Sequence, residues 1–284
     1  MLRKVWVSAL AIAALAGFAA GSAEAAGKGK VKIAYVEWSD SVVATNIAKA
    51  VLEQAGYDVT LTPLAAAAMW QAVATGEADA MMAGWLPVTH KAYYDKLKDQ
   101  VELTTPNVTG AKLGWATPDY TDLKSIEDLK TKSAEVDNKV IGIDPGAGLM
   151  RASEKTIKDY GLSNVKLVEG SDATMVATLK DAINTKQPIV VTAWTPHWMF
   201  ARWKLRYLDD PKGSLGAEET VYTVSRKDLA KDMPEVHKIL KNMKFSLEEE
   251  QKVMVWNEEP GAKPAETAAR WVKENPEIVK SWLQ

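Results

Sequence analysis

The sequence predicts an α/β protein of two similar lobes that face one another across a cleft. Strand-like and helix-like segments alternate along the chain, which is typical of parallel βαβ units. A helix–turn–strand segment that closes on Trp-x-Pro occurs twice, at 72–87 and at 182–196, which indicates a duplication. Turn-rich segments at 115–125 and 209–213 indicate that the chain crosses to a second lobe and back. Two crossings form a hinge that permits closure over a ligand.

The first lobe is predicted to comprise residues 26–115 and 212–284. Its strand-like segments are 31–36, 59–61 and 79–82, separated by helix-like segments at 39–56 and 70–76. The tail from residue 221 has a helical composition and is expected to wrap back onto this lobe.

The second lobe is predicted to comprise residues 116–211. It repeats the opening pattern of the first lobe, with a strand at 139–143, a tight turn at 144–148 and a helix from about Leu149.

Residues 1–25 are predicted to be a signal peptide that is cleaved on export. Arg3 and Lys4 give a positive start, residues 5–23 carry no charge, and Ala23 and Ala25 suit a signal peptidase. An uncleaved membrane anchor is the alternative, because the uncharged stretch could almost span a bilayer. The chain has no cysteine for a lipid anchor. We therefore expect a freely soluble protein outside the inner membrane.

The composition excludes several classes of function. The 284 residues suffice for two modest domains, and 47% hydrophobic with 25% charged residues is an ordinary globular balance. The net charge of −2 leaves no basic excess for a phosphate backbone, so nucleic acid is not expected as a partner. The lack of cysteine excludes disulfides, thiolate nucleophiles, Cys-ligated zinc and iron–sulfur clusters. The unusual figure is 11 Trp beside 3 Phe, which points to a functional use of tryptophan.

Catalytic motifs are missing from the sequence. It contains no nucleophile elbow, no His-Glu-x-x-His pair and no phosphate-binding loop. The three histidines, at 90, 197 and 237, are not spaced as a metal pair, and the turn at 144–148 lacks the dinucleotide spacing. We therefore expect no enzyme activity, no metal and no cofactor.

Three tryptophans are candidates for a binding site. Trp38, Trp85 and Trp194 each follow a predicted parallel strand at its carboxyl end, where ligands bind in open α/β sheets. The negative faces of several indoles make a cage for a cation that cannot form hydrogen bonds, such as a quaternary ammonium group. Packing between the lobes is the alternative role for each of them.

The turn before the second lobe's helix is a candidate for binding an anion. The residues Gly146, Ala147 and Gly148 place unpaired amides and the positive end of the helix dipole at one point. His90, five residues after Trp85, can add a side-chain donor, although a surface histidine and a plain tight turn are the alternatives. An aromatic cage beside a helix N-terminus together describes a site for a zwitterion.

Longer motifs carry a family resemblance. The segments Gly84–His90, Gly142–Met150 and Ala193–Arg202 resemble the glycine betaine-binding proteins of osmoprotectant ABC transporters, and Leu208–Gly213 and Met233–Val236 also match. The resemblance implies a type II-like periplasmic-binding-protein fold, in which each lobe is a mostly parallel sheet flanked by helices. It further implies a periplasmic protein that closes on betaine and delivers it to a permease in the inner membrane. We expect a monomer.

The resemblance also implies roles for individual residues. Trp38, Trp85 and Trp194 would surround the trimethylammonium group, while His90 and the amides of 146–148 would hold the carboxylate. Trp198, in the same motif, is expected to pack only.

Two departures from the family pattern keep choline as an alternative ligand. Asp40 stands where betaine binders often have Glu, and a choline-binding relative uses an Asp there for the hydroxyl. Trp115 falls near an extra cage aromatic of that relative. Glycine betaine or a close betaine is favoured, because His90 and the 146–148 loop have no evident task in choline binding. An enzyme or a receptor module acting on betaines is the remaining alternative.

Overall fold

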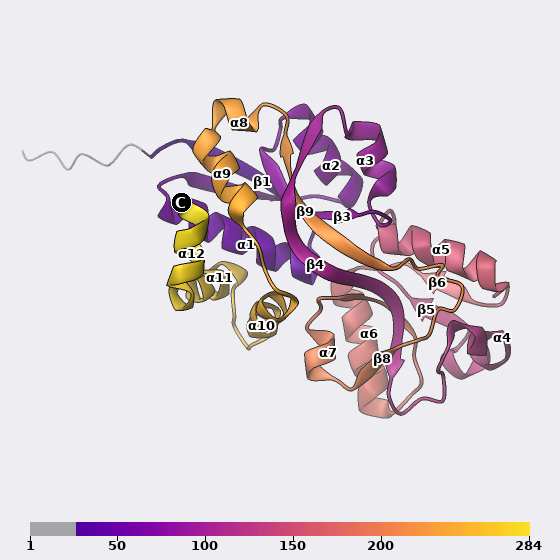
Figure 1. Ribbon diagram of the computed structural model, residues 1–284. Helices are drawn as coiled ribbons and strands as arrows, with labels where there is room; N and C mark the ends of the chain where they lie inside the picture. The colour runs from indigo at the N-terminus through magenta and orange to yellow at the C-terminus, as the bar shows by residue number, and fades with distance from the viewer. Residues whose placement is uncertain (1–26) are drawn as a thin grey trace, which may run out of the picture.

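One curled sheet runs through the molecule and carries strands of both lobes (Figure 1). The computed structural model describes residues 27–284, so the predicted signal peptide at 1–25 lies outside the described residues. The strand order is β2-β1-β3-β9-β4-β7-β5-β6, and β8 pairs with β4. The strands are β1 (Lys30–Tyr35), β2 (Asp58–Pro63), β3 (Ala80–Leu86), β4 (Val101–Pro118), β5 (Lys139–Ile141), β6 (Lys166–Val168), β7 (Val191–Thr195), β8 (Leu205–Tyr207) and β9 (Glu218–Arg226).

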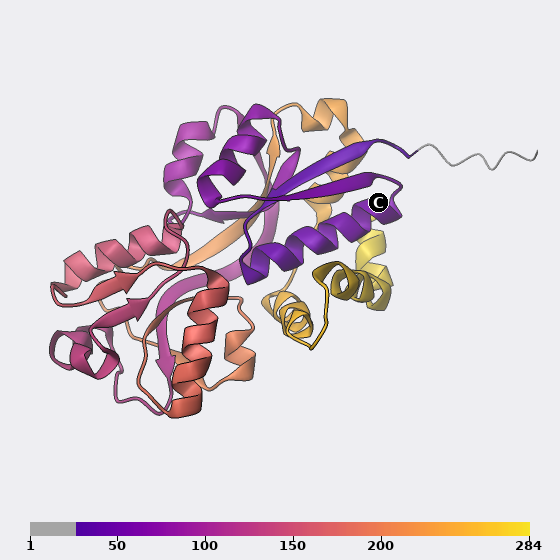
Figure 2. The ribbon, with the colours of Figure 1, turned by 180° about the vertical axis from the view of Figure 1, so that it is seen from behind.

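The helices fall into two groups, one for each lobe (Figures 1 and 2). The first lobe has α1 (Ser39–Gln54), α2 (Ala66–Thr75), α3 (Lys91–Leu97), α8 (Leu229–Asp232), α9 (Pro234–Asn242), α10 (Leu247–Asn257), α11 (Pro264–Glu274) and α12 (Pro276–Leu283). The second lobe has α4 (Leu129–Lys132), α5 (Gly148–Tyr160), α6 (Asp172–Thr185) and α7 (Met199–Arg202).

Helix α1 connects the parallel strands β1 and β2, as the alternating pattern predicts. Its apolar side chains Ile47, Val51 and Leu52 are fully buried, because the sheet packs against α1 and so do α10 and α11. The segment ends at Gly56, whose φ of 98° suits glycine. The chain then enters β2. Because α1 is firmly packed, Trp38 and its neighbours are held in place at its start.

Strand β4 joins the two lobes. It pairs antiparallel with β9 from Val101 to Lys112, and antiparallel with β7 from Lys112 to Ala116. The change of partner occurs at Lys112, whereas the first lobe was predicted to end at 115; the lobe boundaries stay a prediction. The α/β two-lobe architecture is confirmed, but the middle of the sheet is antiparallel. Mostly parallel sheets were expected because strands and helices alternate along the chain, whereas antiparallel neighbours need no crossover helix that would mark them in the sequence.

Membrane-spanning structure is not found in the described part of the chain. None of the helices between residues 27 and 284 is both long enough and apolar enough to cross a bilayer. The C-terminal helices α10 and α11 instead pack against α1.

Candidate ligand-binding site

A small cavity lies between the lobes, where α1 and β3 of the first lobe meet α5 and β7 of the second. The space between its atoms, part of which is open to solvent, is about 290 Å³. The cavity wall is made of Trp38, Asp40, Trp85, Thr89, Leu113, Ile143, Ala147, Gly148, Leu149 and Trp194. The structure thus brings together residues that the sequence separates by more than 150 positions.

The three candidate tryptophans form much of this wall. Trp38 directly precedes α1, Trp85 lies in β3 and Trp194 lies in β7. All three are buried. Each indole N–H already has an acceptor; for Trp38 it is Oδ2 of Asp144 in the second lobe, at 2.9 Å. The indoles therefore offer the cavity apolar ring atoms and no free donor, which suits a cation without hydrogen bonds.

Asp40 ties two of these tryptophans together. Its Oδ2 accepts a hydrogen bond from Nε1 of Trp85 at 3.2 Å, and its Oδ1 accepts one from Nε1 of Trp194 at 3.0 Å. Burial raises the pKa of this carboxyl to about 6, although both indole donors favour the charged form. Asp40 therefore places a carboxylate in the wall of an aromatic cage at neutral pH, which favours a cationic ligand.

Glu250 is a second buried carboxyl, and it lies close enough to Asp40 for the charge of Asp40 to affect its pKa. Burial, followed by the charge of Asp40, raises the pKa of Glu250 well above its ordinary value. Glu250 lies in α10, far from Asp40 in the sequence. No sequence signal marks it, since its surroundings follow from the packing of α10 on α1.

The start of α5 forms another part of the wall. Ala147 precedes the helix, and Gly148 and Leu149 are its first two residues. The first amides of a helix have no intrahelical partner, and the dipole adds positive potential there. A Cβ on Gly148 would lie 2.1 Å from the carbonyl oxygen of Thr89 in the first lobe. Glycine is therefore required for the two backbones to meet at this point.

A family model and several known proteins match this chain. Residues 29–274 match the family OpuAC, described as the substrate binding domain of the ABC-type glycine betaine transport system. The chain belongs to the OpuAC family. This is a family of substrate-binding domains and not of enzymes, in agreement with the lack of catalytic motifs in the sequence.

Individual relatives agree with the family. The glycine betaine/carnitine transport binding protein GbuC of Listeria monocytogenes is 40% identical over 57% of this chain and 54% of its own length. The chain thus matches about half the length of that relative. The lactococcal OpuAC in its closed form with glycine betaine is 40% identical, with a TM-score of 0.86 over 90% of this chain and 100% of that one. A choline-binding protein in complex with choline is 29% identical, with a TM-score of 0.84 over 89% and 91% of the two chains.

Three candidate residues of this OpuAC-family protein lie off the cavity wall. Gly146 is not part of the wall, and its carbonyl accepts a hydrogen bond from the hydroxyl of Tyr93 at 2.6 Å. Trp115 is fully buried in the sheet and donates to Oγ of Ser153 at 2.9 Å. The wall residue on β4 is Leu113, two positions earlier.

His90 is the third of these residues, and it lies behind the cage. Its Nδ1 accepts from the backbone N–H of Trp85 at 3.2 Å, and its ring stacks against Trp38 with centroids 5.9 Å apart. Burial, together with the charge of Arg151, lowers its pKa to about 3, so the ring is neutral. Its Nε2 is buried without a hydrogen-bond partner among the described residues. Contact between His90 and a ligand stays a prediction.

Proposed function

We propose that this protein captures glycine betaine, or a close betaine, in the periplasm and delivers it to the permease of an ABC transporter. The observation that carries the proposal is the pairing, in one small cavity, of an aromatic cage containing a carboxylate with the first amides of a helix. These two parts of the cavity wall suit the two charges of a betaine. Family membership and the predicted signal peptide support transport outside the cytoplasm, and we propose that the protein acts as a monomer.

The trimethylammonium group belongs in the cage of Trp38, Trp85 and Trp194. A desolvated cation over an indole face gains about 2 kcal/mol or more, and this group needs no hydrogen-bond partner. The charge of Asp40 adds attraction for the cation. The carboxylate belongs at the amides that begin α5, where hydrogen bonds and the helix dipole both favour an anion.

Choline is the second candidate, because Asp40 lines the cavity and can accept a hydrogen bond from a hydroxyl. Choline presents the same cation as betaine but no anion. Bound choline would leave the amides at the start of α5 without a charged partner. The positive end of α5 therefore favours betaine over choline.

We expect glycine betaine to bind at least about 100-fold more tightly than choline. Hydrogen bonds to a charged group are each worth about 1.5–3 kcal/mol, and a buried donor left unpaired costs about 1–3 kcal/mol. A difference of about 2.7 kcal/mol corresponds to 100-fold in affinity. Titration calorimetry of the chain without residues 1–25, with each ligand under the same conditions, measures the ratio. Equal affinities, with binding of choline abolished in Asp40→Ala, would make choline the ligand.

We expect the affinity for glycine betaine to rise by up to about tenfold between pH 5 and pH 7. The pKa of Asp40 is about 6, so the carboxyl is mostly protonated at pH 5 and mostly ionised at pH 7. A bound cation stabilises the ionised form and lowers this pKa, so binding releases a proton below pH 6. Calorimetry across this range in Asp40→Asn should give a weaker but pH-independent affinity. The same pH dependence in the variant as in the wild type would assign the effect to another group.

A further inference from the structure

The first turn of α1 contacts the second lobe at three successive residues. Trp38 and Asp40 reach Asp144 and Trp194, as described above. Ser39 lies between them and reaches Asp172, the first residue of α6. These bonds join the two lobes, so a separation of the lobes would break them. The turn therefore distinguishes the closed form from an open one.

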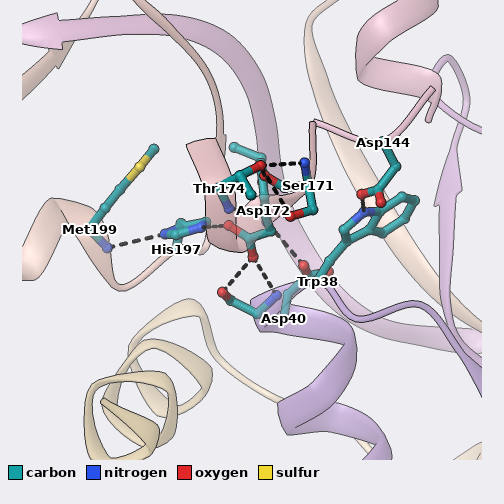
Figure 3. A network of polar contacts seen from close by, with 10 residues as sticks. Trp38, Asp40, Asp144, Ser171, Asp172, Thr174, His197 and Met199 are labelled. Atoms are coloured by element: carbon teal, nitrogen blue, oxygen red, sulfur yellow. Dashed lines mark hydrogen bonds and ion pairs between the residues drawn. The ribbon is translucent and has the colours of Figure 1, made fainter. Parts of the chain in front are cut away.

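Asp172 is the acceptor at the centre of these contacts (Figure 3). The backbone N–H and the hydroxyl of Ser39 both donate to its Oδ2, at 3.0 and 2.7 Å, and Nε2 of His197 donates to its Oδ1 at 3.0 Å. A capping box between Ser171 and Thr174 fixes the start of α6, and so the position of Asp172. Both oxygens of a side chain that is only 5% exposed are therefore satisfied.

The surroundings of Asp172 stabilise its charge. It lies at the start of α6 and faces the start of α1, so the positive ends of two helix dipoles are directed at it. Burial alone would raise its pKa, but His197 and Ser39 hold the pKa below the ordinary value. An ionised acceptor makes stronger hydrogen bonds than a neutral one.

The network also reaches the cage from behind. Nδ1 of His197 accepts from the backbone N–H of Met199 at 3.1 Å, which leaves Nε2 with the proton that it donates to Asp172. The ring of His197 packs edge-on against Trp194, with centroids 4.5 Å apart. Asp172 thus supports two cage walls, Trp38 through the adjacent Ser39 and Trp194 through His197.

We propose that Asp172 is a positioning residue that locks the closed form by docking the first turn of α1, and so sets the rate at which the bound betaine leaves. This inference rests on the proposed function. Ligand enters an open form, in which the contact between Ser39 and Asp172 does not exist. The lock should therefore slow dissociation and leave association nearly unchanged.

Ser39→Ala tests the lock with the smallest change. It removes the hydroxyl donor to Asp172 and leaves His197 and the backbone bond in place. We expect the dissociation rate of glycine betaine to rise about tenfold or more, with the association rate within about threefold of the wild type. Stopped-flow tryptophan fluorescence measures both rates. The melting temperature of the ligand-free variant should stay near that of the wild type.

Ser41→Ala is the matched control. Its hydroxyl is buried in the same helix and has no hydrogen-bond partner among the described residues, so its rates should equal those of the wild type. Asp172→Asn, which loses the charge, should dissociate faster than Ser39→Ala. A wild-type dissociation rate in Ser39→Ala, or an effect on the association rate alone, would contradict the proposed role of Asp172. A wild-type protein that binds no glycine betaine would instead refute the proposed function itself.

Discussion

Replacing Trp38, Trp85 or Trp194 by alanine is expected to weaken the binding of glycine betaine by about 30-fold or more in each case. The expectation follows from the value of a desolvated cation–π contact, about 2 kcal/mol or more. Replacing Trp85 or Trp194 should weaken binding more than replacing Trp38, because each of these two also donates a hydrogen bond to one oxygen of the buried Asp40. Calorimetric titration of the three variants gives the affinities.

Trp198→Ala is the control for the loss of a tryptophan. Trp198 is nearly buried but does not line the cavity, and it packs against Trp203 with centroids 5.3 Å apart. Its loss should lower the melting temperature and change the affinity much less than the loss of a cage residue. Normal binding by all three cage variants would show that the cation is held elsewhere.

Gly148→Ala is expected to weaken binding by about 100-fold without unfolding the protein. The added Cβ would lie 2.1 Å from the carbonyl oxygen and 2.7 Å from the carbonyl carbon of Thr89. Both are backbone atoms of the opposite lobe, so the lobes have to separate. Overpacking costs about 1–3 kcal/mol, and the upper end corresponds to about 100-fold in affinity. Alanine favours the helix itself, so the second lobe should keep its stability.

Small-angle scattering with saturating ligand is the structural readout for Gly148→Ala. The wild type should contract on binding, and the variant should stay more extended. Gly27→Ala adds the same methyl group where the nearest atom, the carbonyl oxygen of Gly56, is 3.5 Å away, and it should bind normally. A Gly148→Ala protein that binds and contracts like the wild type would mean that the lobes close without this backbone contact.

Most of the cage could be predicted from the sequence because its signals are local. Trp85 and Trp194 end strands within a repeated segment, and Trp38 stands between a strand and a helix start. The carboxyl ends of parallel strands meet at one edge of the sheet. The position of these residues therefore follows from the order of the elements, before any side-chain packing is known.

The supporting residues could not be predicted, because their roles depend on tertiary packing. Ser39 and Asp172 are separated by 133 positions and meet only across the two lobes. The charge of Asp40 affects the pKa of Glu250 only because α10 packs on α1. Trp115 illustrates the opposite case: the resemblance to a choline-binding relative suggested a place near the ligand, but the course of β4 puts its side chain in the core.

A crystal structure of the complex with glycine betaine tests the central claim most directly. We expect the quaternary nitrogen within about 6 Å of the ring centroids of Trp38, Trp85 and Trp194. We expect the carboxylate at about 2.7–3.2 Å from the first amide nitrogens of α5. A ligand bound outside this cavity, or one that directs its carboxylate toward the tryptophans, would contradict the account.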